Sequence, residues 1–222
     1  MRDRIARAAD RAKRDPAGVR LIAISKTFDA DYVRAAADAG QIDFGENKVQ
    51  EALEKMDRTS DLPLRWHLVG HLQSNKAKKA GGRFAAIHSV DSPELLRRID
   101  ESAAVAGRTP QVLVQVDLAG ETTKHGAGEA DLAAIFQAAA GAAHLEPSGL
   151  MLLPPAVDDP NQARPYFRAL QQVRDRLLAG GVNAAWLRDL SMGMSHDFEV
   201  AVEEGSTMVR VGTAIFGSRT YS

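Results

Sequence analysis

The sequence has no cysteine, few aromatic residues and no long hydrophobic run. The absence of cysteine excludes disulfides, thiolate metal sites and cysteine nucleophiles, and it suits a reducing compartment. No apolar stretch approaches the roughly 20 residues that a membrane-spanning helix needs. The 28 Lys and Arg residues are balanced by 29 Asp and Glu residues, so no basic field attracts nucleic acid or a membrane surface.

The sequence also lacks a recognisable targeting signal or internal boundary. Residues 1–15 are charged throughout and have no apolar centre, unlike a secretory signal. The 222 residues are 45% hydrophobic and 26% charged, as in an ordinary globular protein, and no linker or shift in composition divides them. The six histidines show no HxH or HExxH spacing, so no metal site is expected. We expect a cytoplasmic protein whose residues 1–222 form one domain.

A regular alternation of short apolar runs and amphipathic segments fills the chain. After an opening helix over 2–14, strands are predicted at 19–25, 42–46, 66–70, 85–90, 112–117, 147–153, 185–190 and 207–211. Helices are predicted from 29 or 31 to 39, over 47–56, as a short basic helix after 70, from 92, and over 131–143, 161–179 and 197–204.

This alternation predicts the fold. Short apolar strands that are separated by helices pair in parallel. Eight such units in about 220 residues make a minimal (β/α)8 barrel, of the triosephosphate isomerase (TIM) type. A doubly wound open sheet is the alternative, but that fold usually stops at fewer strands. The fold class is therefore α/β, with a single barrel.

The last two predicted strands carry a candidate phosphate site. Strand 185–190 runs into Ser191-Met192-Gly193-Met194-Ser195, and strand 207–211 runs into Gly212-Thr213. Backbone N–H groups that small residues leave bare form an anion-binding nest, and phosphate sits beyond strands seven and eight in many barrels. Tight turns that bind nothing are the alternative.

Lys26 directly follows the first predicted strand, at the expected mouth of the barrel. Partial desolvation there would lower the pKa of its amine and free it for attack on a carbonyl. A lysine that reaches to solvent is the alternative. The first and eighth strands are neighbours in a closed barrel, so an amine and a phosphate cradle come together. A ligand with an aldehyde and a phosphate fits, either pyridoxal phosphate or a phosphosugar.

Other residues at the strand ends are further candidates for the pocket. They are Glu46, Asn47, His71, Gln73, Asn75, His88, Asp91, Lys124 and Met151. Arg210 alternates with Val209 and Val211, so its side chain faces the other way, into the pocket. Opposite a pyridine nitrogen, a guanidinium would keep that nitrogen unprotonated and the ring a poor electron sink. An ion pair with a barrel carboxylate such as Glu46 is the alternative.

At these residues the sequence resembles the YggS/PROSC family of pyridoxal phosphate homeostasis proteins, over nearly the whole chain. The motifs are Ser25-Lys26-Thr27, Phe44-Gly45-Glu46-Asn47, Val49-Gln50-Glu51, Trp66-His67, Leu72-Gln73-Ser74-Asn75-Lys76, His88-Ser89-Val90-Asp91-Ser92, Gly149-Leu150-Met151, Leu190-Ser191-Met192-Gly193-Met194-Ser195, Gly205-Ser206-Thr207, Val209-Arg210-Val211-Gly212-Thr213 and Ile215-Phe216-Gly217. Two positions depart from the family pattern, Lys48 in place of a tyrosine and His71 in place of other residues.

The resemblance implies a barrel of the fold-type III kind, like the N-terminal domain of alanine racemase. It implies pyridoxal phosphate as cofactor, held as a Schiff base on Lys26. It also implies Arg210 facing the pyridine nitrogen and Asn47 near the ring. The phosphate ligands that it implies are Ser191, the Met192 backbone, Gly212 and Thr213.

The leading hypothesis is a protein that buffers, protects or delivers pyridoxal phosphate and catalyses nothing. Related racemases add a C-terminal β-domain with a tyrosine base, whereas this sequence ends five residues after Gly217, so no such domain is expected. The expected partners are pyridoxal phosphate and apo forms of enzymes that use it, without nucleic acid or membrane, and a monomer is expected. The alternatives are a weak amino-acid racemase or decarboxylase and an aldolase-like enzyme that acts on a phosphosugar.

Overall fold

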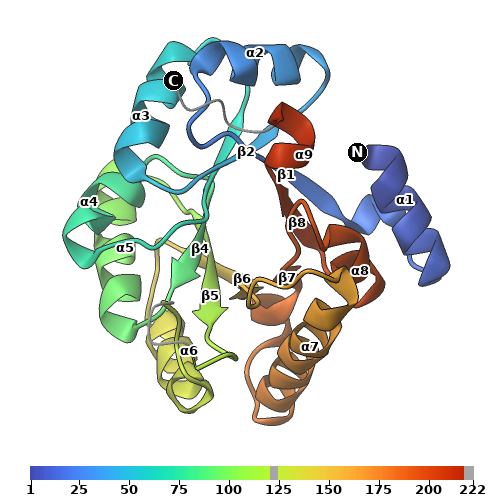
Figure 1. Cartoon of the computed structure of the whole chain (residues 1–222). Helices are drawn as coiled ribbons and strands as arrows, with labels where there is room; N and C mark the ends of the chain where they lie inside the picture. Colours follow the sequence, from blue (N-terminus) through green and yellow to red (C-terminus); the bar gives the residue numbers. More distant parts are fainter. Residues whose placement is uncertain (121–124, 218–222) are drawn as a thin grey trace.

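In the computed structural model, which describes residues 1–120 and 125–217, eight parallel strands close into a barrel inside a ring of helices (Figure 1). The strands are β1 (Arg20–Ile24), β2 (Asp43–Glu46), β3 (Arg65–Leu68), β4 (Ala86–Val90), β5 (Gln111–Val116), β6 (Glu146–Leu152), β7 (Asp189–Ser191) and β8 (Met208–Val211). The helices are α1 (Arg2–Arg11), α2 (Ala30–Asp38), α3 (Val49–Arg58), α4 (Ala77–Ala80), α5 (Pro93–Ala106), α6 (Leu132–Ala140), α7 (Arg164–Ala179), α8 (Phe198–Glu203) and α9 (Thr213–Phe216).

The pairing of β1 with β8 closes the barrel. The register runs from Arg20 opposite Met208 to Ala23 opposite Val211, and on its other edge β1 pairs with β2 through Ala23 and Phe44. Every neighbouring pair is parallel, in the order of the sequence. The predicted (β/α)8 barrel is confirmed, and the open-sheet alternative is wrong.

The helix ends follow from local capping. The carboxylate of Asp29 accepts a hydrogen bond from the amide of Asp31 and begins α2, and the hydroxyl of Ser92 accepts one from Leu95 at the start of α5. Pro93 occupies the first turn of α5, where its missing N–H costs nothing. Gly107 ends that helix in the left-handed conformation, with φ of +60°.

Two short elements differ from the prediction. The strand predicted over 185–190 is instead a 3-10 turn over Ala184–Leu187, followed by the short β7. The side chain of Asn183 accepts a hydrogen bond from the amide of Ala185, and this local bond competes with strand pairing. The sequence analysis also missed α9, a single turn that directly follows Gly212.

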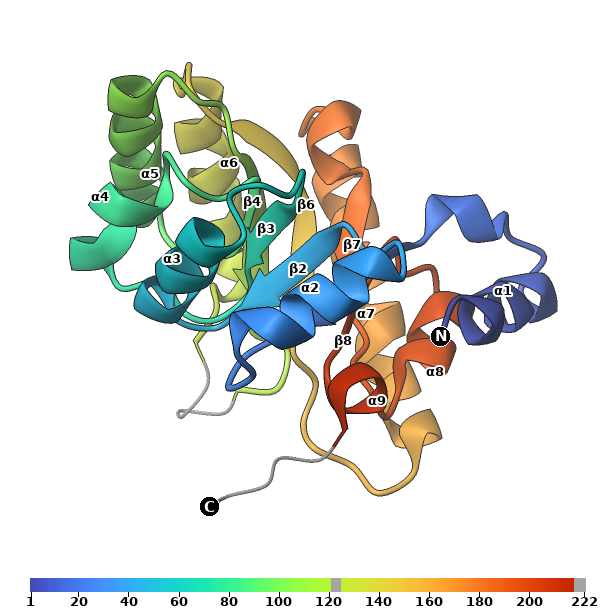
Figure 2. The ribbon, with the colours of Figure 1, turned by 90° about the horizontal axis from the view of Figure 1, so that it is seen from above.

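Apolar side chains fill both the interior of the barrel and the layer between strands and helices. The interior cluster contains Ile22, Ile24, Val69, Leu113, Met151 and Met208. Gly45 leaves room for this cluster, because a Cβ atom there would lie 2.4 Å from Ile24 Cδ1 and the isoleucine side chain would have to move. A separate cluster joins α1 to α8, which lie side by side in Figures 1 and 2, through residues such as Ile5 and Phe198. In the described part of the chain, no helix combines the length and apolarity needed to cross a membrane.

Candidate functional site

A cavity of about 670 Å³ opens at the C-terminal ends of the strands. Figure 2 shows α9 and the segment from β6 to α7 at this same end. The walls carry five of the predicted polar residues and one further glycine: Lys26, Asn47, His71, Arg210, Thr213 and Gly212. The strand ends of a barrel therefore bring together residues that are up to 187 positions apart, as the sequence predicted for an active face.

The turn that carries Lys26 is held from both sides. The carbonyl of Ser25 accepts a hydrogen bond of 2.7 Å from Lys55 Nζ, and the amide of Thr27 donates one of 2.6 Å to Glu51 Oε1. Thr27 has a φ of +72°, a conformation that a β-branched residue adopts only when its surroundings impose it. The strained residue is thus next to Lys26, and α3 supplies both residues that hold the turn, Glu51 and Lys55.

Glu46, predicted as a pocket residue, is used in this support instead. Its carboxylate is buried and accepts hydrogen bonds from Lys55 Nζ at 2.6 Å and from the Ser25 hydroxyl at 2.6 Å. Burial raises the pKa of Glu46, although both donors oppose that shift. Glu46 does not line the cavity, so the ion pair between Glu46 and Arg210 that the sequence left open is wrong.

Arg210 is almost fully buried, with 4% of its surface exposed at the cavity wall. One guanidinium nitrogen donates to Ser191 Oγ at 2.7 Å and another to the carbonyl of Leu152 at 2.8 Å. Burial lowers the pKa of Arg210 to about 10, and the nearby Asp197 acts in the opposite direction. The guanidinium is therefore a fixed positive charge at neutral pH. Its side chain faces the cavity, as its alternation with two valines predicted.

The loop after β7 approaches the loop after β8 at one hydroxyl. Ser195 Oγ accepts hydrogen bonds from the amides of Gly212, at 3.1 Å, and Ala214, at 3.4 Å. Two backbone N–H groups thus point at a single oxygen on the cavity wall. Gly193 makes this loop possible, since its φ is +95° and a Cβ atom there would lie 2.5 Å from the Cβ of Ala201.

Two of the predicted phosphate ligands lie below the cavity wall. The buried hydroxyl of Ser191 contacts His88 and Arg210, and the Met192 amide donates to the carbonyl of Met208 within the barrel. Neither residue lines the cavity, whereas Met194, Ser195 and His196 from the same loop do. Sequence reasoning missed Ser195 as a separate group, although it ends the same small-residue run.

The rim of the cavity contains a pair of stacked histidines. The rings of His71 and His125 lie 3.5 Å apart at 10° to one another, and His71 Nδ1 is 3.6 Å from a carboxylate oxygen of Asp91. Desolvation and the neighbouring His125 lower the pKa of His71, and Asp91 raises it. The unusual His71 is thus a rim residue, whereas the unusual Lys48 is exposed at the start of α3 and does not line the cavity.

The remaining candidates lie elsewhere. His88 and Met151 are buried in the barrel interior, and Gln73 does not line the cavity. Asn75 lines a separate surface groove with Lys78 and Lys79, and Lys124 lies outside the described residues. Three further residues line the cavity and were not predicted: Gln115 on β5, and Leu153 and Pro154 directly after β6. Within residues 1–120 and 125–217, no group of three or more metal-ligating side chains comes together.

The donor set of the cavity fits a ligand with an aldehyde and an anionic group. Lys26 offers a primary amine, the Gly212 amide beside Ser195 offers an anion-binding donor, and Arg210 offers a buried cation that can only donate hydrogen bonds. All three lie on the wall of one cavity.

Comparison with known proteins identifies relatives over the full length. The family described as alanine racemase, N-terminal domain, matches residues 1–220. The chain is 42% identical to the pyridoxal phosphate homeostasis protein of Aquifex aeolicus, over 99% of this chain and 95% of the relative. It is 43% identical to the protein of that name from Pseudomonas aeruginosa, over 98% and 92% of the two chains.

Solved structures give the same relationship. PipY of Synechococcus elongatus, determined without pyridoxal phosphate, has a TM-score of 0.86 and 41% identity, over 96% of this chain and 99% of that one. PipY with pyridoxal phosphate bound has a TM-score of 0.84 and 40% identity, over 96% and 100%. An alanine racemase of Clostridium difficile, at 16% identity, shares the fold with a TM-score of 0.69 over 99% of this chain and 60% of its own. The chain belongs to the family of pyridoxal phosphate homeostasis proteins, built on the fold of the alanine racemase N-terminal domain.

Proposed function

We propose that this protein binds pyridoxal 5'-phosphate in the cavity and takes part in the homeostasis of that cofactor. One observation carries the proposal: Lys26, Arg210, Ser195 and Gly212 line a single cavity, and the Gly212 amide is directed at Ser195 Oγ. The names of the relatives and the pyridoxal phosphate bound to PipY support it.

Each group has a role toward the cofactor. Lys26 forms a Schiff base with its aldehyde, and Arg210 faces its pyridine nitrogen. Gly212 and Thr213, with Ser195, would hold the phosphate, and Asn47 would lie near the ring; all four residues line the cavity. Ser191, beneath the wall, acts through Arg210, and Met192 shapes the loop.

We further propose that the protein is a carrier that catalyses nothing. Pyridoxal phosphate, when bound, supplies an electron sink whose strength depends on protonation of its ring nitrogen. Arg210 keeps its charge at neutral pH and can only donate hydrogen bonds, so it leaves that nitrogen unprotonated. Exchange of the α-proton of small amino acids with solvent, catalysed by the loaded protein and lost in Lys26→Ala, would instead support a weak racemase or decarboxylase.

The visible absorption spectrum tests cofactor binding. Purified protein is incubated with pyridoxal phosphate, desalted and scanned beside Lys26→Ala treated in the same way. We expect a retained visible absorption band of the bound cofactor in the wild type alone, because only the wild type has the amine. No band in either protein would reject the proposal and favour a phosphosugar, whereas equal bands in both would reject the role of Lys26.

The cellular setting belongs to the same proposal. We place the protein in the cytoplasm as a monomer that passes pyridoxal phosphate to apo enzymes. Light scattering of the loaded protein tests whether it is a monomer. Activation of an apo enzyme by the loaded protein tests the transfer. We expect it to be faster than activation by the cofactor that leaks from the loaded protein across a dialysis membrane, which is the control.

A further inference from the structure

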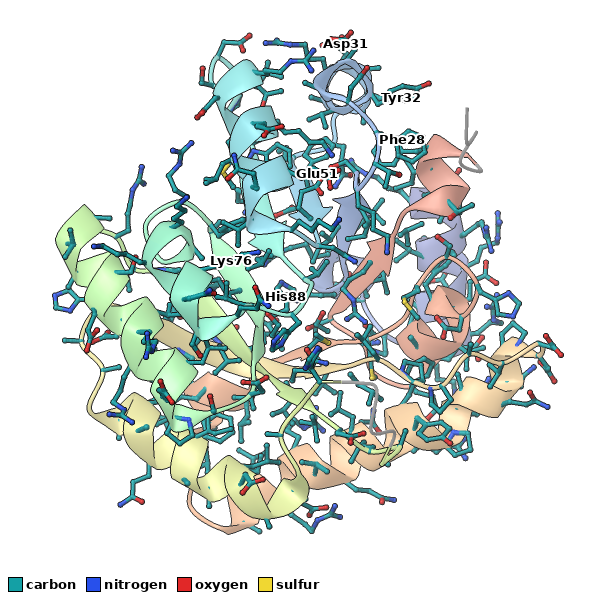
Figure 3. All side chains as sticks on the ribbon, turned by 60° about the vertical axis from the view of Figure 1, so that its left-hand side comes forward. Phe28, Asp31, Tyr32, Glu51, Lys76 and His88 are labelled. Carbon is teal, nitrogen blue, oxygen red and sulfur yellow. The ribbon has the colours of Figure 1, made fainter. Side chains whose placement is uncertain are left out.

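A line of buried polar groups crosses the interior of the barrel beneath the cavity. We call Asp43, His67, His88, Ser191 and Arg210 the interior network. Each comes from a different strand, in the order β2, β3, β4, β7 and β8. All five have at most 6% of their surface exposed, and Figure 3 shows His88 inside the ring of helices. The proposed function assigns no task to Asp43, His67 or His88.

The contacts of the interior network are continuous. Asp43 Oδ1 lies 2.9 Å from His67 Nε2, and His67 Nδ1 lies 3.0 Å from His88 Nε2. His88 Nδ1 lies 2.9 Å from Ser191 Oγ, which accepts a hydrogen bond of 2.7 Å from Arg210. The contact between His88 and Ser191 spans the barrel, because β4 and β7 are not neighbours in the sheet.

When both histidine rings are neutral, the two ends of the interior network fix the direction of every hydrogen bond. Asp43 is an acceptor, since its other oxygen already accepts a bond of 2.6 Å from Arg65, so His67 must donate from Nε2. The neutral His67 then accepts at Nδ1, His88 donates from Nε2 and accepts at Nδ1, and Ser191 donates to His88. The Ser191 oxygen is thereby turned toward Arg210, which can only donate.

The charges around the histidines agree with neutral rings. Burial lowers the pKa of His67 and of His88, and Asp43 opposes the shift at His67. The cations Arg20, Arg65 and Arg210 also act on the pair and disfavour a further positive charge. A neutral ring is required at both positions for the bonds to keep one direction.

We infer that Asp43, His67 and His88 are positioning residues that hold Arg210 through the hydroxyl of Ser191. The role in holding Arg210 stands on the geometry alone. The consequence for pyridoxal phosphate, a guanidinium fixed against the ring nitrogen, rests on the proposed function. The interior network thus extends the cofactor site from the mouth of the barrel to Arg65, whose side chain is half exposed at the opposite end.

Nitrogen NMR of the histidine rings tests the network without cofactor. In long-range ¹H–¹⁵N spectra we expect His67 and His88 both to carry the proton on Nε2. In Asp43→Asn, Arg65 remains a donor, so the amide oxygen turns to Arg65 and the NH2 group turns to His67. Both histidines should then move their proton to Nδ1. A proton on Nδ1 of His88 in the wild type, or unchanged rings in the variant, would overturn the inference.

The spectrum of the loaded protein tests the link to the cofactor. His88→Phe keeps an aromatic ring but removes both hydrogen bonds of His88, to His67 and to Ser191. Ser191→Ala needs no repacking and removes both hydrogen bonds of the Ser191 hydroxyl, to His88 and to Arg210. In both we expect about tenfold weaker binding of pyridoxal phosphate and a shifted pH titration of the bound chromophore. Ser89→Ala is the matched control, since its buried hydroxyl on the same strand has no hydrogen bond in the described structure.

The outcomes separate the inference from the proposed function. Wild-type binding and an unshifted titration in Ser191→Ala would reject the positioning role. Failure of the wild type to bind pyridoxal phosphate would reject the proposed function, while the ring-nitrogen spectra would still decide whether the network holds Arg210.

Discussion

Single residues set the chemistry of the cavity, and Arg210 is the clearest case. Its alternation with two valines predicted the direction of the side chain, and the structure confirms that it reaches the cavity wall. Its partners, Ser191 and the carbonyl of Leu152, could not be predicted from the sequence. They depend on which strands face one another across a closed barrel, and on a carbonyl that carries no sequence signal.

Arg210→Lys tests the value of a guanidinium at this position. One ammonium group cannot keep both bonds in the same geometry, so we expect about tenfold weaker binding of pyridoxal phosphate and a loss of stability of about 1–3 kcal/mol. Arg168→Lys, at an exposed ion pair on α7, is the control and should change stability by no more than about 0.5 kcal/mol. Equal behaviour of the two variants in fluorescence titration and urea unfolding would contradict this account.

At the scale of elements, α3 supports the lysine turn. Glu51 and Lys55 lie one helical turn apart and form an ion pair of 2.8 Å that joins the amide of Thr27 to the carbonyl of Ser25. The sequence predicted the helix and the turn but not their connection. A lysine inside an amphipathic helix ordinarily faces solvent, whereas Lys55 has only 5% of its surface exposed.

Lys55→Met tests this support through the buried Glu46. Loss of the cation leaves a buried carboxylate without an ion pair, so we expect a destabilisation of about 3–5 kcal/mol. The pKa of Glu46 is already raised by burial and should rise further without Lys55. A carboxyl whose folded pKa exceeds its unfolded pKa loses stability as the pH rises through the folded value. The deficit measured by urea unfolding should therefore be larger at pH 8 than at pH 5.

A double variant provides the control for this prediction. Glu46→Gln combined with Lys55→Met removes the buried charge, so its deficit should be smaller and should depend less on pH. A Lys55→Met deficit that is equal at both pH values would show that Glu46 is not the group responsible.

At the scale of the whole molecule, the barrel converts eight separate strand ends into one cavity. The strand alternation predicted this closure, and the motifs predicted where Lys26 and Gly212 would meet. The hydrogen bonds in the barrel interior were not predicted in the same way. In the sequence, inward residues such as His67 and His88 are only polar residues within apolar strands. Their hydrogen bonds depend on register and on contacts across the barrel, which one sequence pattern does not specify.

The same interior predicts how the stability of the molecule depends on pH. Burial lowers the pKa of His67 and His88 in the folded state below the ordinary value of 6.5. Below about pH 6.5 the unfolded chain therefore binds more protons, and these two groups make stability fall as the pH falls. The slope that they contribute is at most about 1.4 kcal/mol per pH unit for each histidine.

Urea unfolding between pH 5 and pH 7.5 measures this slope. We expect His88→Phe to show a smaller slope than the wild type, because one buried histidine is gone. A wild-type stability that increases on acidification in the range from pH 6.5 to pH 5.5, or an equal slope in the variant, would contradict the assignment of neutral buried rings.

The central claim is that Lys26 holds pyridoxal phosphate in the cavity. The most direct measurement is borohydride reduction of the loaded protein, followed by proteolysis and mass spectrometry of the peptides. We predict a single reduced pyridoxyl phosphate adduct, on Lys26, that is absent from Lys26→Ala. An adduct on another lysine, or none, would contradict the account.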